Sequence, residues 1–207
     1  VSNPATPISP LGRNEVLVSV VVSAGNAACG LGALGLLSDT VDDVEHAWTP
    51  RDPAHWWRHL EALNRVVVAL RAYGADGEPL LDRVATLVQE VPLAMLSHSS
   101  DQAGHLCAAT LTHCAGSYAE LERYPERDQG LKRVREISVK LNPWDLMEGV
   151  GGLAAEARRA GSLALAGEAL RGAELFDAKT QGRFRAELVG KLAQAAVGPL
   201  RQALTTG

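Results

Sequence analysis

Residues 16–37 read VLVSVVVSAGNAACGLGALGLL, and the fold of the chain depends on how this stretch is interpreted. It contains no Asp, Glu, Lys, Arg or His; its first half is rich in valine and its second half in glycine and alanine. Three structures fit such a pattern: a membrane-spanning helix, a strand leading into a dinucleotide-binding loop, or a buried helix. Each of them implies a different protein.

The membrane interpretation is supported by length alone, because a span needs about 20 apolar residues. Two serines, one asparagine and four glycines lower the gain from insertion, and no cluster of Lys or Arg flanks the stretch. A secretion signal fits no better, because Arg13 is the sole basic residue before it and residues 26–29, NAAC, make a poor lipoprotein motif. We therefore expect a cytoplasmic protein that does not bind membranes.

The nucleotide interpretation depends on residues 30–35, GLGALG, which match the G-x-G-x-x-G pattern of dinucleotide-binding loops. The first glycine lies eight residues beyond the predicted strand, and the next segments have helical patterns, so no second parallel strand completes the dinucleotide-binding unit.

The interpretation that remains is a buried helix. Small residues recur in it at spacing four, and its four glycines cost about 3–4 kcal/mol of helix propensity. We expect a neighbouring backbone to pack closely against them.

Composition predicts an all-α fold. Among the 207 residues Ala, Leu and Val dominate, whereas Ile and Phe occur twice each. Pro-rich residues 1–12 predict an extended N-terminal arm, and residues 13–207 a single α-helical domain in which 143–207 could form a C-terminal helical subregion. We predict a helical bundle of six to eight helices with the Gly/Ala-rich helix buried at its centre.

Local signals place several helix boundaries. Ser38 or Asp39 is a suitable cap for a new short helix, and Asn142 followed by Pro143 is a typical helix start. Residues 131–141, LKRVREISVKL, remain ambiguous, because their apolar residues suit a helix while EISVK alternates as a strand does.

Two histidines at spacing four suggest a metal or haem site. His55 and His59, in HWWRH, share one face of a helix and could chelate one metal, with Glu45 and His46 completing the site if the preceding helix folds back. Trp56 occupies the position of the glutamate in HExxH, so a zinc-protease site is excluded. The alternative is that both histidines border a solvent-exposed face.

The charge distribution suggests a second, weak site. The net charge is −4, with −6 in residues 1–103 and +2 in residues 104–207. Acidic residues dilute the richest basic segment, so we expect at most weak contact with nucleic acid. The basic residues that would make this contact are Arg127, Lys132, Arg133, Arg135 and Lys140.

The three cysteines, Cys29, Cys107 and Cys114, are expected to be buried and reduced. His98, His105 and His113 lie in or near the segment that holds Cys107 and Cys114, and a nucleophilic Cys–His pair would need a hydrogen bond between separate elements. No cluster identifies a reaction, so whether the chain is an enzyme stays open. The first hypothesis is a non-enzymatic helical interaction or assembly protein, self-associating or a subunit of a larger complex. The alternatives are a metal- or haem-binding protein or enzyme, and a nucleic-acid-binding accessory protein.

Overall fold

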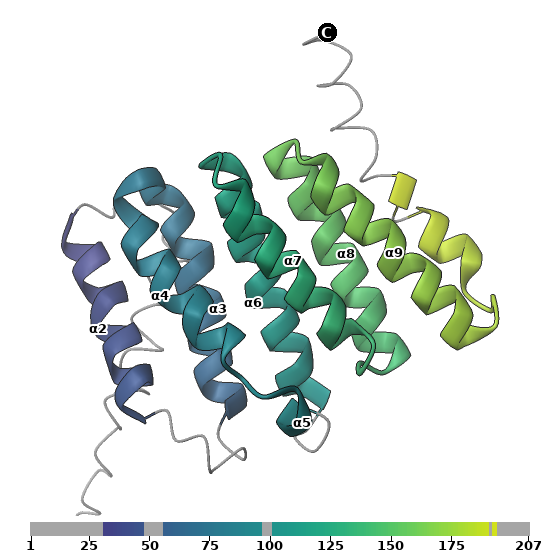
Figure 1. The fold of residues 1–207 in the computed structure, drawn as a ribbon, viewed down its shortest axis with the longest axis horizontal. Coiled ribbons are helices and arrows are strands. Elements are labelled where there is room, and N and C mark those ends of the chain that lie inside the picture. Colours follow the sequence, from purple (N-terminus) through teal and green to yellow (C-terminus); the bar gives the residue numbers. More distant parts are fainter. Residues whose placement is uncertain (1–30, 48–55, 97–100, 191, 194–207) are drawn as a thin grey trace, which may run out of the picture.

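A computed structural model describes residues 31–47, 56–96, 101–190 and 192–193 of the chain (Figure 1). The predicted all-α class is confirmed: these residues form seven α-helices of twelve residues or more and no strand. The α-helices are α2 (Leu31–Ala47), α3 (Trp56–Leu70), α4 (Glu78–Gln89), the short α5 (Leu93–Leu96), α6 (Asp101–Glu120), α7 (Tyr124–Ser138), α8 (Pro143–Ala160) and α9 (Leu163–Thr180). A 3-10 helix, η3 (Arg71–Gly77), joins α3 to α4.

The helices form three antiparallel hairpins, α3–α4, α6–α7 and α8–α9, that stack side by side (Figure 1). The first helices of the hairpins, α3, α6 and α8, pack against one another in one layer, and α4, α7 and α9 form the other. Because α3, α6 and α8 run in the same direction, their C-terminal halves lie at the same edge of the stack. The sequence has no internal repeat, yet this arrangement resembles that of helical repeat proteins.

The first helix of the stack, α2, packs against α3 and α4 at one end (Figure 1). It continues through Ser38 and Asp39, so the predicted cap there is wrong. The reason is packing: Leu37, Val41 and Val44 are fully buried, at spacings of four and three that keep one helical face against the core.

Only residues 31–37 of the uncharged stretch are described, and they open α2 at the edge of the stack. Gly35 is exposed, and a Cβ added there would meet no atom within 4 Å, so Gly35 does not serve close packing. The central position of the whole stretch stays a prediction, as does the arm of residues 1–12, since residues 1–30 lie outside the described residues. No described helix is long and apolar enough to cross a membrane.

The other boundaries follow local chemistry. The Asn142 side chain accepts a hydrogen bond from Asp145 N at 3.0 Å, so the predicted start of α8 is confirmed. Gly161, at φ 61°, ends the same helix in the left-handed conformation that glycine adopts easily. The ambiguous segment is helical through Ser138, because Ile137 is completely buried on the helical face that packs inward.

The packing of α8 against α9 predicts opposite effects for two glycine substitutions. A Cβ at Gly172 would lie 2.8 Å from Val150 Cγ2, whereas a Cβ at Gly152 would meet nothing within 4 Å. Gly172→Ala should lower the free energy of unfolding by about 1–2 kcal/mol, because the branched valine cannot move aside easily. Gly152→Ala, the matched control, should raise it by up to about 1 kcal/mol. Urea denaturation followed by circular dichroism measures both, and equal effects would contradict the close contact between Gly172 and Val150.

Candidate functional site

The residues predicted to bind metal are only partly placed. His55 lies outside the described residues, and His59 is buried in α3 with 7% of its surface exposed. Glu45 is ion-paired with Arg83 at 2.7 Å, and His46 is exposed in the last turn of α2. The described ranges contain no group of three or more His, Cys, Asp or Glu residues arranged to hold a metal. The site that uses His55 stays a prediction.

The residues predicted to contact nucleic acid lie on α7 and just after it. Lys132 and Lys140 are exposed. The three arginines are ion-paired within the chain, in the pairs Arg127–Asp128, Arg133–Glu136 and Arg135–Glu168. A phosphate would have to compete with these carboxylates, which weakens the attraction that the basic sequence suggested. Nucleic-acid binding therefore stays a prediction, and these ion pairs weaken its electrostatic support.

The described cysteines are buried and are not in disulfides. Burial raises the pKa of the Cys107 thiol to about 12 and also raises the pKa of Cys114. Only a thiolate is an effective nucleophile, so neither residue is prepared for covalent catalysis at neutral pH. His113, the neighbour of Cys114 in sequence, is hydrogen-bonded to Glu156 instead.

A buried carboxylate connects the three parallel helices at their C-terminal edge. Glu156 of α8 has a side chain that is 5% exposed. Its Oε1 lies 2.5 Å from Arg71 Nη2, just after α3, and 2.9 Å from His113 Nδ1 of α6. Its Oε2 accepts a hydrogen bond from Arg159 Nε at 2.9 Å. We call Arg71, His113, Glu156 and Arg159 the Glu156 cluster.

The cluster holds Glu156 in its ionised form. Burial alone would raise the pKa of this carboxyl group, but the hydrogen bond from His113 and the charge of Arg71 outweigh it and lower the pKa to about 2. Such a group neither donates nor takes a proton near neutral pH, so it is unsuited to acid–base catalysis. Gly116 of α6 leaves the necessary space, because a Cβ there would overlap the Glu156 carboxylate. The cluster therefore joins helices.

Sequence reasoning missed Glu156, because AAEARRA resembles a solvent-exposed helical segment. The signal that could have found it is indirect. Gly116 lies in the interior of α6, where glycine costs about 1 kcal/mol relative to alanine. Such a residue implies that something packs closely against it, but the sequence does not say which side chain this is.

A second notable surface is the outer side of α9. Leu163 is 61% exposed and Leu170 is 54% exposed. They are seven residues apart and therefore lie on one side of the helix, with Gly167 between them. We call Leu163, Gly167 and Leu170 the α9 stripe. The α9 stripe is thus an exposed apolar row on the outer side of the last long helix of the described chain.

The exposed large apolar residues of the described chain, those of the α9 stripe included, are concentrated late in the sequence. Apart from Tyr124, whose ring packs on the Arg127 guanidinium at 4.8 Å, all of them follow α7. They are Val139, Trp144, Leu163, Leu170 and Val189. Three of these residues, Trp144, Leu163 and Leu170, belong to the last hairpin, α8–α9.

Comparison of the chain with protein-family models, with characterised proteins and with solved structures finds no match. Its function is therefore argued from its own residues and geometry.

The Glu156 cluster predicts an acid-labile fold. Because the folded pKa is about 2 and the value for an unfolded chain is 4.5, Glu156 stabilises the fold fully above pH 4.5, and this contribution is lost as pH falls toward 2. Glu156→Gln should lower the free energy of unfolding at pH 7 by about 3 kcal/mol and flatten its decline between pH 4.5 and 2. Denaturant titrations across that pH range measure both effects.

The control is Glu148→Gln, since Glu148 also faces a histidine of α6, His105, but at 3.5 Å and with a side chain that is 69% exposed. Its substitution should change stability by less than about 0.5 kcal/mol. Equal losses in the two variants would show that the Glu156 cluster does not stabilise the fold more than a surface pair does.

Proposed function

We propose that this chain is a non-enzymatic helical interaction protein that self-associates through the α9 stripe. The observation that carries the proposal is the exposure of Leu163 and Leu170 on one side of α9. Because the two leucines are 61% and 54% exposed, completing their burial yields about 1–2 kcal/mol for each side chain. A helix that belongs to a stable stack offers this surface without having to refold.

The stripe is self-complementary. Leu163 and Leu170 flank a midpoint at Ala166 and Gly167, so an antiparallel pair of α9 helices would bring Leu163 of one copy opposite Leu170 of the other. Such a two-fold contact uses the same patch on both copies, as most homodimers do. A Cβ at Gly167 would meet no atom within 4 Å among the residues that the structure describes. A second backbone packed against Gly167 accounts for a residue that is costly within a helix.

The proposal places the protein in the cytoplasm. Cys107 and Cys114 are both buried free thiols, which is typical of a reducing compartment. A different protein that offers an apolar helix could occupy the same stripe and make this chain a subunit of a larger complex. We favour a second copy, because the symmetry of the stripe supports a two-fold contact.

Self-association is tested by charge substitution. Sedimentation velocity over a range of protein concentrations should show the wild type moving from the 21.9 kDa chain to twice that mass. The variants Leu163→Lys and Leu170→Lys should remain monomeric, because each would place a cationic group in the apolar contact. Circular dichroism verifies that both retain the helical fold, as expected for exposed positions.

The control is Ala178→Lys, which adds the same charge at an exposed position of α9 outside the stripe. It should associate as the wild type does. A wild type that stays monomeric at all concentrations would contradict self-association. Dimers that persist in both leucine variants would show that the copies meet elsewhere.

A further inference from the structure

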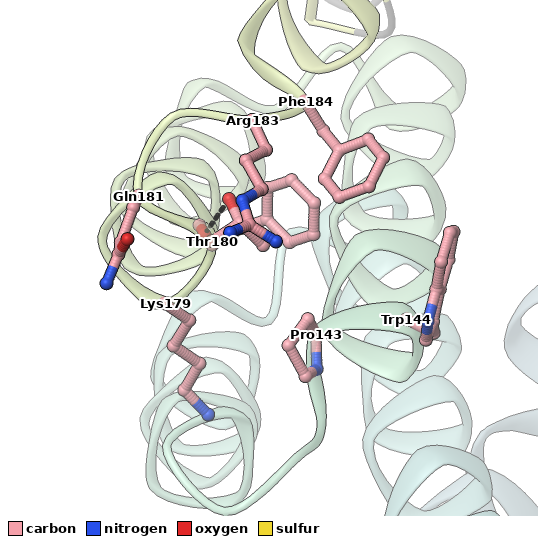
Figure 2. Close-up of a pocket in the computed structure, with 8 residues that line it drawn as sticks. Pro143, Trp144, Lys179, Thr180, Gln181, Arg183 and Phe184 are labelled. Carbon is pink, nitrogen blue, oxygen red and sulfur yellow. Dashed lines mark hydrogen bonds between the residues drawn. The ribbon is translucent and has the colours of Figure 1, made fainter.

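A pocket of about 320 Å³ lies between the start of α8 and the end of α9 (Figure 2). It is separate from both the Glu156 cluster and the α9 stripe, with which it shares no residue. Pockets that hold small molecules start near this volume, at about 300 Å³. Its lining residues are Pro143 and Trp144 of α8; Phe176, Lys179 and Thr180 of α9; and Gln181, Arg183 and Phe184, which follow α9.

The turn after α9 builds one wall of this pocket. Gln181 and Gly182 both have positive φ, 52° and 75°, so the chain reverses sharply. Arg185 then pairs with Asp177 at 2.6 Å and fastens the returning chain to α9. Arg183 is held between these points, and Figure 2 shows it extending into the pocket while Gln181 points away.

Aromatic side chains form a row from the core to the surface. Phe176 is buried, and its ring centroid is 6.2 Å from that of Phe184. Phe184 in turn lies 5.6 Å from Trp144, with the rings tilted by 57°. Trp144 ends the row and is 63% exposed, so much of its indole surface is free to contact a ligand. A flat apolar ring is the group that packs best on such a surface.

The polar lining is cationic. Two of the described lining residues, Lys179 and Arg183, carry positive charge and none is acidic. Lys179 is held in place by the carbonyl groups at the end of α7, since its Nζ donates to Val139 O at 3.0 Å and to Leu141 O at 2.6 Å. Arg183 has no carboxylate partner within the described chain, so its guanidinium retains its donors for a ligand. A guanidinium binds carboxylate and phosphate groups through paired hydrogen bonds.

We infer that this pocket binds a small organic anion with a planar ring. The carboxylate or phosphate pairs with Arg183, and the positive charge of Lys179, which is held by the carbonyl groups after α7, adds a longer-range attraction. The ring packs on Trp144 and covers the edge of Phe184. An anion without a ring would lose the aromatic contact, and a ring without a charge would lose the contact with Arg183, so both parts are needed for binding.

Isothermal titration calorimetry of the full chain tests this inference with four probes. Adenosine monophosphate and 2-naphthoate each join a ring to an anion, adenosine supplies an uncharged ring, and inorganic phosphate supplies an anion alone. At least one of the first two should bind, and more tightly than adenosine or inorganic phosphate. Binding of adenosine monophosphate alone identifies a phosphate ligand, and binding of 2-naphthoate alone identifies an aromatic carboxylate.

Two variants assign the binding to the pocket. Arg183→Gln and Trp144→Leu should each raise the dissociation constant about tenfold, the effect of one lost charged hydrogen bond or one lost stacking contact. The control is Arg158→Gln, an equal loss of charge at an exposed position near the other end of α8. It should bind as the wild type does, and thermal melts show whether each variant remains folded.

Three results would overturn the inference. One is that neither ring-bearing anion binds at millimolar concentration. Another is that adenosine or inorganic phosphate binds as tightly as the ring-bearing anions do. The third is that Arg183→Gln and Arg158→Gln change the dissociation constant equally, which would locate the binding outside the pocket.

Discussion

The buried carboxylate of Glu156 is the constraint on which the arrangement of the first layer depends. It draws together groups from α8, α6 and the segment after α3, and its position requires glycine at Gly116. An isolated charge in this position would cost several kcal/mol, so the hydrogen bonds and opposite charges of its partners must all be present. Leucine could occupy a similar volume, but it would not require His113 and Arg71 to meet at one point. We infer that the cluster contributes to the alignment of the helices as well as to stability.

In the second layer, too, carboxylates bind polar or cationic groups of a neighbouring hairpin. Asp82 of α4 accepts hydrogen bonds from Tyr118 of α6 and from Arg123, which precedes α7, both at 2.8 Å. Glu168 of α9 is buried and pairs with Arg135 of α7 at 2.7 Å. Each junction between neighbouring hairpins therefore contains a carboxylate bound by groups from the adjacent hairpin. Apolar burial supplies most of the driving force in such a stack, and these directional contacts fix how one hairpin sits on the next.

The class of the fold could be predicted from the sequence because propensity and apolar spacing are local properties. The start of α8 at Asn142 and Pro143 follows from the same local chemistry. The cap predicted at Ser38 was wrong, because the burial of Leu37 and Val41 outweighs a capping preference worth about 1 kcal/mol. Tertiary packing decided that boundary, and packing partners far apart in sequence cannot be found from spacing alone.

The candidate sites also depend on contacts between residues far apart in the sequence, which spacing along the chain does not reveal. Histidine spacing drew attention to His59, which is buried, and the basic segment to Arg135, which is engaged by Glu168. Arg183 stood out in neither pattern, because a single arginine after a helix carries no signal by itself. Its significance comes from the turn that places it beside Phe184 and opposite Trp144. Only the folded chain brings these residues together.

The glycines of the stack fall into two groups, those that a neighbouring side chain requires and those that have no close neighbour in the described chain. At Gly116 and Gly172 a neighbouring side chain fills the space that a Cβ would need, so the fold itself requires glycine there. At Gly149, Gly151, Gly152 and Gly167 a Cβ would meet no atom within 4 Å in the described part of the chain, so each of these glycines lowers helix propensity without allowing a close contact there. These four glycines lie in α8 and α9, the hairpin that also exposes leucines and borders the aromatic pocket, and Gly35 of α2 is open in the same way. The proposed contact with a second copy would account for Gly167 and for the exposed leucines on the same helix.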